Sequence, residues 1–234
     1  MKTVILAGGK GTRLAPYTTI FPKPLVPIGN RPILEIIIRQ LVEQGFLDVI
    51  LSIGYLGELI EAYFHNGRRN IPGLRLDYFR ENEQLGTAGP LAMIPGLDET
   101  FLVMNGDILT KIDYRELIRH HREQMAALTI AMHRKDIKID LGVLETSDAG
   151  ELVSYNEKPV YSFDVSMGIY VYEPRVLECI PKGKYMDFPD LVRTLLDCGE
   201  KVVGFHSQDY WLDIGRREDY ERAQQEFDFG TAEF

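Results

Sequence analysis

The stretch Val4-Ile-Leu-Ala-Gly-Gly-Lys-Gly-Thr-Arg-Leu-Ala-Pro-Tyr-Thr-Thr-Ile-Phe-Pro-Lys-Pro-Leu-Val-Pro27 decides the fold, because an apolar strand breaks into a glycine-rich loop. Residues 3–7 form a continuous β-branched and apolar run, which predicts a buried strand. The loop glycines allow positive φ and let successive N–H groups approach an anion; they are Gly8, Gly9 and Gly11. Positive charge is added by Lys10, Arg13 and Lys23. We therefore expect the loop to bind a polyphosphate.

The spacing of the loop excludes two common phosphate-binding motifs. A Walker A loop needs a glycine five positions before its Gly-Lys pair, and Val4 stands there relative to Gly9-Lys10. The dinucleotide fingerprint needs a third glycine where this chain has Leu14. What remains is Gly-Gly-x-Gly-x-Arg followed by Pro-Lys-Pro.

Length and composition bound the class of protein. The chain has 234 residues, 45% of them apolar, and no Pro/Ser-rich linker, so we expect one domain over residues 1–227 with a tail at 228–234. A formal net charge of −9 argues against non-specific nucleic-acid binding. No apolar run reaches the ~20 residues of a membrane span. Two cysteines without metal-type spacing fit a reducing compartment, and we expect a cytoplasmic protein.

The order of expected elements predicts an α/β fold. Strands are expected at 3–7, 48–53, 74–80, 100–104, 127–133 and 202–206, and helices at 33–41, 56–64, 114–124, 174–180, 188–198 and 218–227. This alternation predicts a mainly parallel, Rossmann-like sheet flanked by helices. Residues 141–172 contain short strands with turn signals, so we expect a partly antiparallel region built over the nucleotide core. Adjacent His120 and His121 diverge around a helix and are interpreted as part of a solvated face rather than a metal site.

The glycine loop and Pro22-Lys23-Pro24 closely resemble the signature of the sugar nucleotidyltransferases, which join a nucleoside triphosphate to a sugar 1-phosphate and release pyrophosphate. The resemblance extends from Lys2 to about Ala223, and Leu85-Gly-Thr-Ala-Gly-Pro-Leu91 has the form seen in mannose 1-phosphate guanylyltransferases. It implies a nucleotide site, whose residues would be Leu6, Ala7, Gly8, Gly9, Gly11, Thr12, Glu81, Gly86 and Thr87. Many relatives carry further C-terminal modules, so their mode of assembly does not carry over to this chain. A homo-oligomer is one possibility.

Residues suited to the chemistry are spread along the chain. The phosphate nucleophile is already ionised near neutral pH, so the site needs cations and a metal rather than a general base. Asp107 follows an apolar strand and Asp213 lies in Trp211-Leu-Asp-Ile-Gly215, and their hard oxygens suit Mg²⁺. The resemblance gives both carboxylates as metal ligands. It gives the other catalytic positions as the cations Arg13, Lys23 and Lys158.

The sugar side of the site also follows from the resemblance. Asn156-Glu157-Lys158-Pro159 matches a Glu-Lys-Pro motif in which Lys binds the sugar's phosphate and Glu accepts hydrogen bonds from sugar hydroxyls. Further sugar contacts are implied at Asn105, Gly142 and Gly168. Relatives usually have Asn two residues before the last of these glycines, where this chain has Ser166. This departure affects the expected sugar contacts.

The nucleobase is expected near Glu81. Relatives that use thymidine or uridine triphosphate typically have Gln at this position, whereas a carboxylate only accepts hydrogen bonds and suits the N1–H and N2–H₂ donors of guanine. The alternative interpretation of Glu81 and Glu83 is as solvated charges at a strand end. The favoured substrates are GTP and a hexose 1-phosphate. The alternatives are thymidylyl, uridylyl or cytidylyl transfer, transfer to a non-sugar phosphate such as a phosphonate or choline phosphate, and a non-catalytic nucleotide-sugar sensor.

Overall fold

A seven-stranded sheet, in the order β12-β8-β11-β6-β1-β4-β5, forms the centre of the protein. The computed structural model describes residues 1–14, 17–65 and 71–228. The strands of this sheet are β1 (Lys2–Ala7), β4 (Asp48–Ile53), β5 (Arg75–Arg80), β6 (Phe101–Asn105), β8 (Leu128–Lys138), β11 (Val160–Tyr172) and β12 (Val202–Ser207). Pairing is parallel throughout β6-β1-β4-β5 and between β12 and β8, and β11 is antiparallel to both of its neighbours. The mainly parallel sheet expected from the sequence is confirmed.

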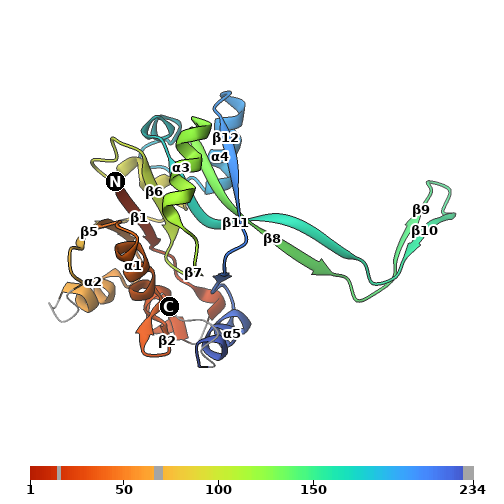
Figure 1. The fold of residues 1–234 in the computed structure, drawn as a ribbon, viewed down its shortest axis with the longest axis horizontal. Helices are drawn as coiled ribbons and strands as arrows, with labels where there is room; N and C mark the ends of the chain where they lie inside the picture. Colours follow the sequence, from red (N-terminus) through yellow and green to blue (C-terminus); the bar gives the residue numbers. More distant parts are fainter. Residues whose placement is uncertain (15–16, 66–70, 229–234) are drawn as a thin grey trace.

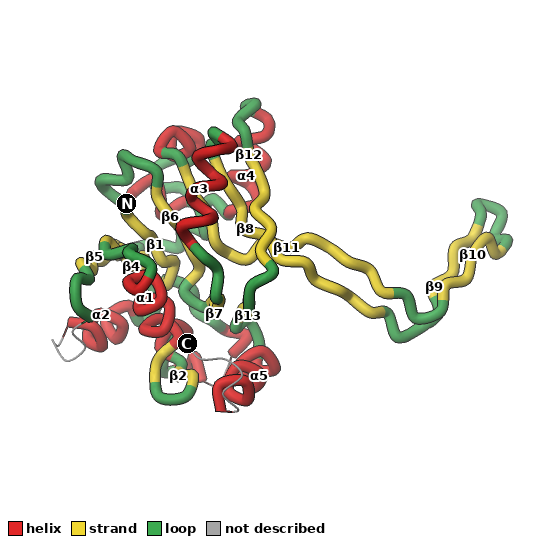
Figure 2. Tube along the Cα trace, in the orientation of Figure 1, coloured by secondary structure: helices red, strands yellow, loops and turns green. Residues whose placement is uncertain are grey.

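Helices cover both faces of this sheet (Figures 1 and 2). They are α1 (Ile33–Glu43), α2 (Gly57–His65), α3 (Tyr114–Gln124), α4 (Phe188–Asp197) and α5 (Arg217–Asp228). Alternate residues of a strand point to opposite faces, so Ile5 joins one apolar core with α1 and α3, while Val4 joins another with α4. Short 3₁₀ segments complete the layers: η1 (Thr12–Leu14), η2 (Tyr17–Thr19), η3 (Lys23–Leu25), η4 (Gly89–Met93) and η5 (Pro174–Cys179).

Three small strand pairs stand outside the central sheet: β2 (Pro27–Ile28) with β3 (Arg31–Pro32), β7 (Ile108–Thr110) with β13 (Trp211–Asp213), and β9 (Val143–Thr146) with β10 (Leu152–Asn156). The closing helix predicted at 218–227 is α5, which takes in Asp228, and the other residues of the predicted tail lie outside the described part of the chain. Within that part, every helix is too short or too polar to traverse a lipid bilayer.

The prediction that His121 belongs to a solvated face of α3 is wrong, because this residue is only 1% exposed. Its ring lies between two polar groups, with Nδ1 2.8 Å from Thr129 Oγ1 and Nε2 3.1 Å from Glu173 Oε1. The ring follows Leu117 and Ile118 on the side of α3 that packs into the core. These two partners satisfy the imidazole and allow a polar residue at an inward position.

The segment at 141–172 is antiparallel as expected, but it does not lie over the nucleotide core. Beyond the body of the protein, β8 and β11 continue as a long two-stranded ribbon that ends in the β9–β10 hairpin and projects away from the remaining structure (Figures 1 and 2). The ladder runs without interruption from Ser166↔Met132 to Val160↔Lys138. The two strands therefore stay paired with each other beyond the last residue of β8 that β12 reaches, His133.

Candidate active site

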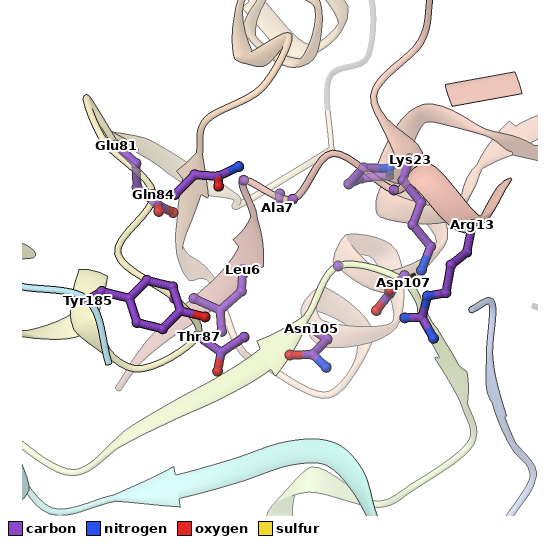
Figure 3. Close-up of a pocket in the computed structure, with 16 residues that line it drawn as sticks. Leu6, Ala7, Arg13, Lys23, Glu81, Gln84, Thr87, Asn105, Asp107 and Tyr185 are labelled. Carbon is purple, nitrogen blue, oxygen red and sulfur yellow. Dashed lines mark hydrogen bonds and ion pairs between the residues drawn. The ribbon is translucent and has the colours of Figure 1, made fainter. Parts of the chain in front are cut away.

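A cavity of about 410 Å³ lies where the parallel strands end (Figure 3). The carboxyl ends of β1, β4, β5 and β6 meet at one edge of the sheet, since Leu6 pairs with Asn105 and Ile53 pairs with Arg80. Open α/β sheets bind ligands at such an edge. The cavity is lined by Leu6, Ala7, Gly8, Gly9, Gly11, Arg13, Lys23, Pro24, Glu81, Gln84, Gly86, Thr87, Asn105, Gly106, Asp107 and Tyr185.

The glycine loop needs glycine at two positions for different reasons. Gly11 has φ +61°, and a Cβ there would lie 2.9 Å from the Cβ of Lys23. At Gly8, an added Cβ would lie 2.7 Å from Glu81 Oε1. A side chain at Gly11 would collide with Lys23, and one at Gly8 would collide with Glu81. Glycine at these positions lets the backbone of the loop line the cavity.

Cations line one end of the cavity. Arg13 lies in η1, and Lys23 begins η3 between Pro22 and Pro24. Lys23 is 7% exposed, and its ammonium group forms an ion pair with Asp107. Figure 3 shows Arg13 beside this pair. The prolines restrict the backbone around Lys23 and so help to fix its position.

Two carboxylates from distant parts of the sequence meet at the same end. β7 and β13 pair with Asp213 opposite Ile108, and the N–H of Ile214 donates to the carbonyl oxygen of Asp107 at 3.0 Å. Burial, and then the negative charge of Asp107, raise the pKa of Asp213, while Lys23 and Arg13 act in the opposite direction. The pairing of β7 with β13 therefore brings the two carboxylates close enough to interact electrostatically.

This pair fits a magnesium ion better than a metal held by protein alone. Among the described residues, no group of three or more His, Cys, Asp and Glu side chains could hold a metal. Mg²⁺ is commonly bound by one or two carboxylates together with substrate phosphates and water. Asp107 and Asp213 provide such a pair next to the phosphate-binding loop.

The opposite end of the cavity contains Glu81, directly after β5. Its Oε1 accepts a hydrogen bond from Ser52 Oγ at 2.8 Å. Burial raises the pKa of Glu81, and the hydrogen bonds from Ser52 and from the backbone of Leu85 partly oppose this effect. The carboxylate is therefore held in place by hydrogen bonds from Ser52 and Leu85.

A second wall at this end was missed by the sequence reasoning. The loop at 85–89 joins the segment before α4, because the carbonyl oxygen of Met186 accepts from Ala88 N and Gly89 N, both at 3.0 Å. Asp187 Oδ1 accepts from Thr87 N at 3.1 Å and brings Tyr185 to the rim of the cavity. The sequence carries no local signal for this contact between segments about 100 residues apart.

The residues expected at the site fall into two groups. All nucleotide-side candidates line the cavity except Thr12, which lies in η1 outside its lining. Asn105 lines it, and Gly168 lies close behind, since a Cβ at Gly168 would be 2.7 Å from Asn105 Nδ2. The other sugar-side candidates stand on the projecting ribbon, away from the cavity: Gly142, Glu157 and Lys158.

The chain is similar to known proteins over nearly its whole length. A family model described as nucleotidyl transferase matches residues 2–228. The UTP–glucose-1-phosphate uridylyltransferase of Synechocystis sp. is 35% identical over 95% of this chain, which spans 62% of that relative's length. The D-glycero-alpha-D-manno-heptose 1-phosphate guanylyltransferase of Aneurinibacillus thermoaerophilus is 34% identical, with 97% of this chain and 98% of the relative covered. The crystal structure of HddC from Yersinia pseudotuberculosis complexed with GMP-PN matches with a TM-score of 0.73 at 28% identity, covering 97% of this chain and 99% of that one.

Proposed function

Since the chain belongs to the nucleotidyl transferase family, we propose that it transfers a nucleotidyl group from a nucleoside triphosphate to a sugar 1-phosphate and releases pyrophosphate. One observation carries the proposal. At the end of a glycine-loop cavity, the structure gathers Arg13, Lys23 and Asp107, with Asp213 beside them. Cations and paired carboxylates at this place match the needs of phosphoryl chemistry between two anions.

The reaction proposed here requires charge neutralisation and alignment. An oxygen of the sugar phosphate attacks the α-phosphorus of the triphosphate, and the bond to the β-phosphate oxygen breaks. Arg13 and the glycine-loop N–H groups hold the triphosphate oxygens, while Lys23 offsets the charge that develops as pyrophosphate leaves. Asp107 and Asp213 would hold Mg²⁺, which stabilises negative charge on the phosphates when bound. The attacking oxygen is already ionised, so the mechanism uses no general base.

Guanine is the base that we propose for the pocket at Glu81. Glu81 accepts hydrogen bonds from Ser52 and from the backbone of Leu85, and a carboxylate has lone pairs for further donors. As an acceptor it complements the N1–H and N2–H₂ donors of guanine. The relatives include both guanylyltransferases and a uridylyltransferase, so the choice of guanine rests on the chemistry of this carboxylate.

The proposal is tested by incubating the protein and Mg²⁺ with each nucleoside triphosphate and a panel of sugar 1-phosphates, and measuring pyrophosphate. We expect release with GTP and a hexose 1-phosphate. Preference for UTP or dTTP would contradict the guanine assignment. Ligand binding without release for any pair would support the nucleotide-sugar sensor instead.

A further inference from the structure

The projecting ribbon has almost no contact with the body of its own chain. We call residues 134–165 the arm; they comprise the outer parts of β8 and β11 together with β9 and β10. In this range only Pro159 is buried. Nine large apolar side chains of the arm are exposed: Ile137, Leu141, Leu144, Leu152, Val153, Tyr155, Val160, Tyr161 and Phe163. An isolated two-stranded ribbon is marginally stable in water, so the arm requires a partner surface.

In the β8–β11 part of the arm, three of the four exposed large apolar side chains share one face, and Val160 lies on the other. Opposed residues of an antiparallel ladder share a face, and Tyr161 lies opposite Ile137 while Phe163 lies two residues further along. The other face is mostly polar: Ser162 Oγ donates to Asp136 Oδ1 at 2.6 Å, and Asp164 lies opposite Arg134. The arm is therefore amphipathic, with polar pairs facing solvent and an uncovered apolar face. This pattern is typical of a ribbon that packs on another protein surface.

The base of the arm is held in the direction that the figures show. β12 pairs with β8 up to Ser207↔His133, so the inner half of β8 is fixed between two strands. Trp211 Nε1 donates to the carbonyl oxygen of Met167 at 2.9 Å and attaches the inner part of β11 to β13. These two attachments anchor the strands from which the arm extends.

The arm carries an organised cluster of the residues expected to bind the sugar phosphate. Tyr155 OH donates to Glu157 Oε2 at 2.6 Å, and a Cβ at Gly142 would collide with the ring of Tyr155. Lys158 has φ +46°, an uncommon conformation for a residue other than glycine. Within the described part of the chain, no carboxylate forms an ion pair with Lys158. The cluster is thus formed on the arm but lies away from any phosphate-binding residue of its own body.

We propose that two copies of this chain exchange arms, so that the Glu157 and Lys158 of one copy complete the sugar-phosphate half of the other copy's cavity. A second copy is the partner that fits, because it offers the same incomplete cavity and an identical arm to exchange under two-fold symmetry. The apolar face at Ile137 and Tyr161 would pack on the body of that copy. The catalytic part of this inference rests on the proposed function, whereas the exchange of arms does not.

The exchange of arms is tested first by the mass of the protein in solution, measured by light scattering without substrate. We expect a dimer for the wild type and a monomer for Ile137→Glu/Tyr161→Lys, which replaces an opposed apolar pair by an ion pair and preserves the ladder. Ser162→Lys places the same kind of pair opposite Asp136 on the polar face, and we expect it to remain a dimer. A monomeric wild type, or a double variant that stays dimeric, would overturn the exchange.

The sharing of residues between copies is tested by complementation. Lys158→Ala and Asp107→Asn chains, each expected to be inactive, are co-expressed with different affinity tags, and the mixed dimer is isolated. Exchange leaves one of its two sites intact, so we expect about half of the wild-type activity per dimer. If each chain used its own arm, both sites would be defective and no activity would return, which would overturn the inference.

The two tests separate this inference from the proposed function. A wild type that turns over substrate but shows neither dimer nor complementation would leave the function standing and reject the exchange. A dimer that depends on the apolar face, in a protein that releases no pyrophosphate with any substrate pair, would retain the exchange and reject the function.

Discussion

At the scale of single residues, the ion pair between Lys23 and Asp107 is central to the site. Both groups are largely removed from solvent, with side-chain exposures of 9% and 23%. Removing one member of such a pair leaves the other charge uncompensated, and this is costly in a low-dielectric site. A bound triphosphate and metal would give Lys23 and Asp107 new partners of opposite charge. The pair therefore keeps the two groups in place when no ligand is present.

Asp213 provides a separate test of the metal pair. Burial and the charge of Asp107 raise its pKa, so the ionised form is disfavoured by the fold, and any stability contributed by the protonated form is lost as the pH rises through the folded-state pKa. Asp213→Asn removes this repulsion. We expect a Tm equal to or above that of the wild type and a loss of turnover of about 100-fold or more, because a metal ligand is lost. A lower Tm with normal turnover, measured by calorimetry and pyrophosphate release, would contradict the assignment.

Glu81 allows a test of base recognition with a matched control. Glu81→Gln replaces an acceptor-only group by an amide that also donates, as uracil and thymine require. We expect the ratio of kcat/KM for GTP over UTP to fall by about 10-fold or more. Glu83→Gln makes the same change at an exposed position outside the cavity lining and should leave this ratio unaltered. Equal ratios in the wild type and Glu81→Gln would remove Glu81 from base selection.

His121 predicts a pH dependence of stability. Burial lowers its pKa below the ordinary value of 6.5, although Glu173 partly opposes this. Between the folded and unfolded pKa values the unfolded chain binds more protons, so the free energy of unfolding falls as the pH decreases below about 6.5. His121→Gln should flatten this part of the profile. Urea unfolding at several pH values measures it, and an unchanged slope in the variant would contradict the role of His121.

At the scale of elements, the irregularity in β11 between Ser166 and Tyr170 lies between the arm and the cavity. Gly168 has φ +73°, and a Cβ there would meet Asn105. Gly168→Ala should therefore destabilise the fold by about 1–3 kcal/mol. It should also displace Asn105 and raise the KM for the sugar phosphate more than the KM for the triphosphate.

Gly150 is the matched control for this substitution. Its φ is +83°, but an added Cβ would have no atom within 4 Å. Gly150→Ala should carry only the backbone strain and leave both KM values unchanged. A similar rise of both KM values in Gly168→Ala would indicate a general structural defect rather than a link to the sugar-phosphate site.

The elements that the sequence predicts well are those with strong local signals. The run at 48–53 and the periodic segment at 114–124 coincide with β4 and α3, because apolar periodicity and end residues determine them locally. The position of the glycine loop at the carboxyl ends of the strands is also predicted locally, because the loop directly follows the apolar run of β1. The sequence does not predict Tyr185 at the cavity, since its position there depends on contacts between distant segments. Site roles for Glu157 and Lys158 remain predictions.

At the scale of the whole molecule, the direction of the arm could not be predicted from sequence. The alternation of side-chain types along residues 128–138 and 160–172 predicts a two-stranded ribbon. It is the same for a ribbon that lies over the core and for one that projects from it. The outcome depends on how β12 and Trp211 hold the base. Body and arm therefore carry separate halves of one expected site.

The most direct test of the proposed reaction is the identity of its products. The wild type is incubated with GTP, a hexose 1-phosphate and Mg²⁺, and the nucleoside diphosphate sugar and pyrophosphate are quantified by mass spectrometry and a coupled assay. We predict equal amounts of the two products, and neither product from Asp107→Asn or after removal of Mg²⁺ by a chelator. Release of inorganic phosphate in place of pyrophosphate, or product formation that persists in Asp107→Asn, would contradict the account.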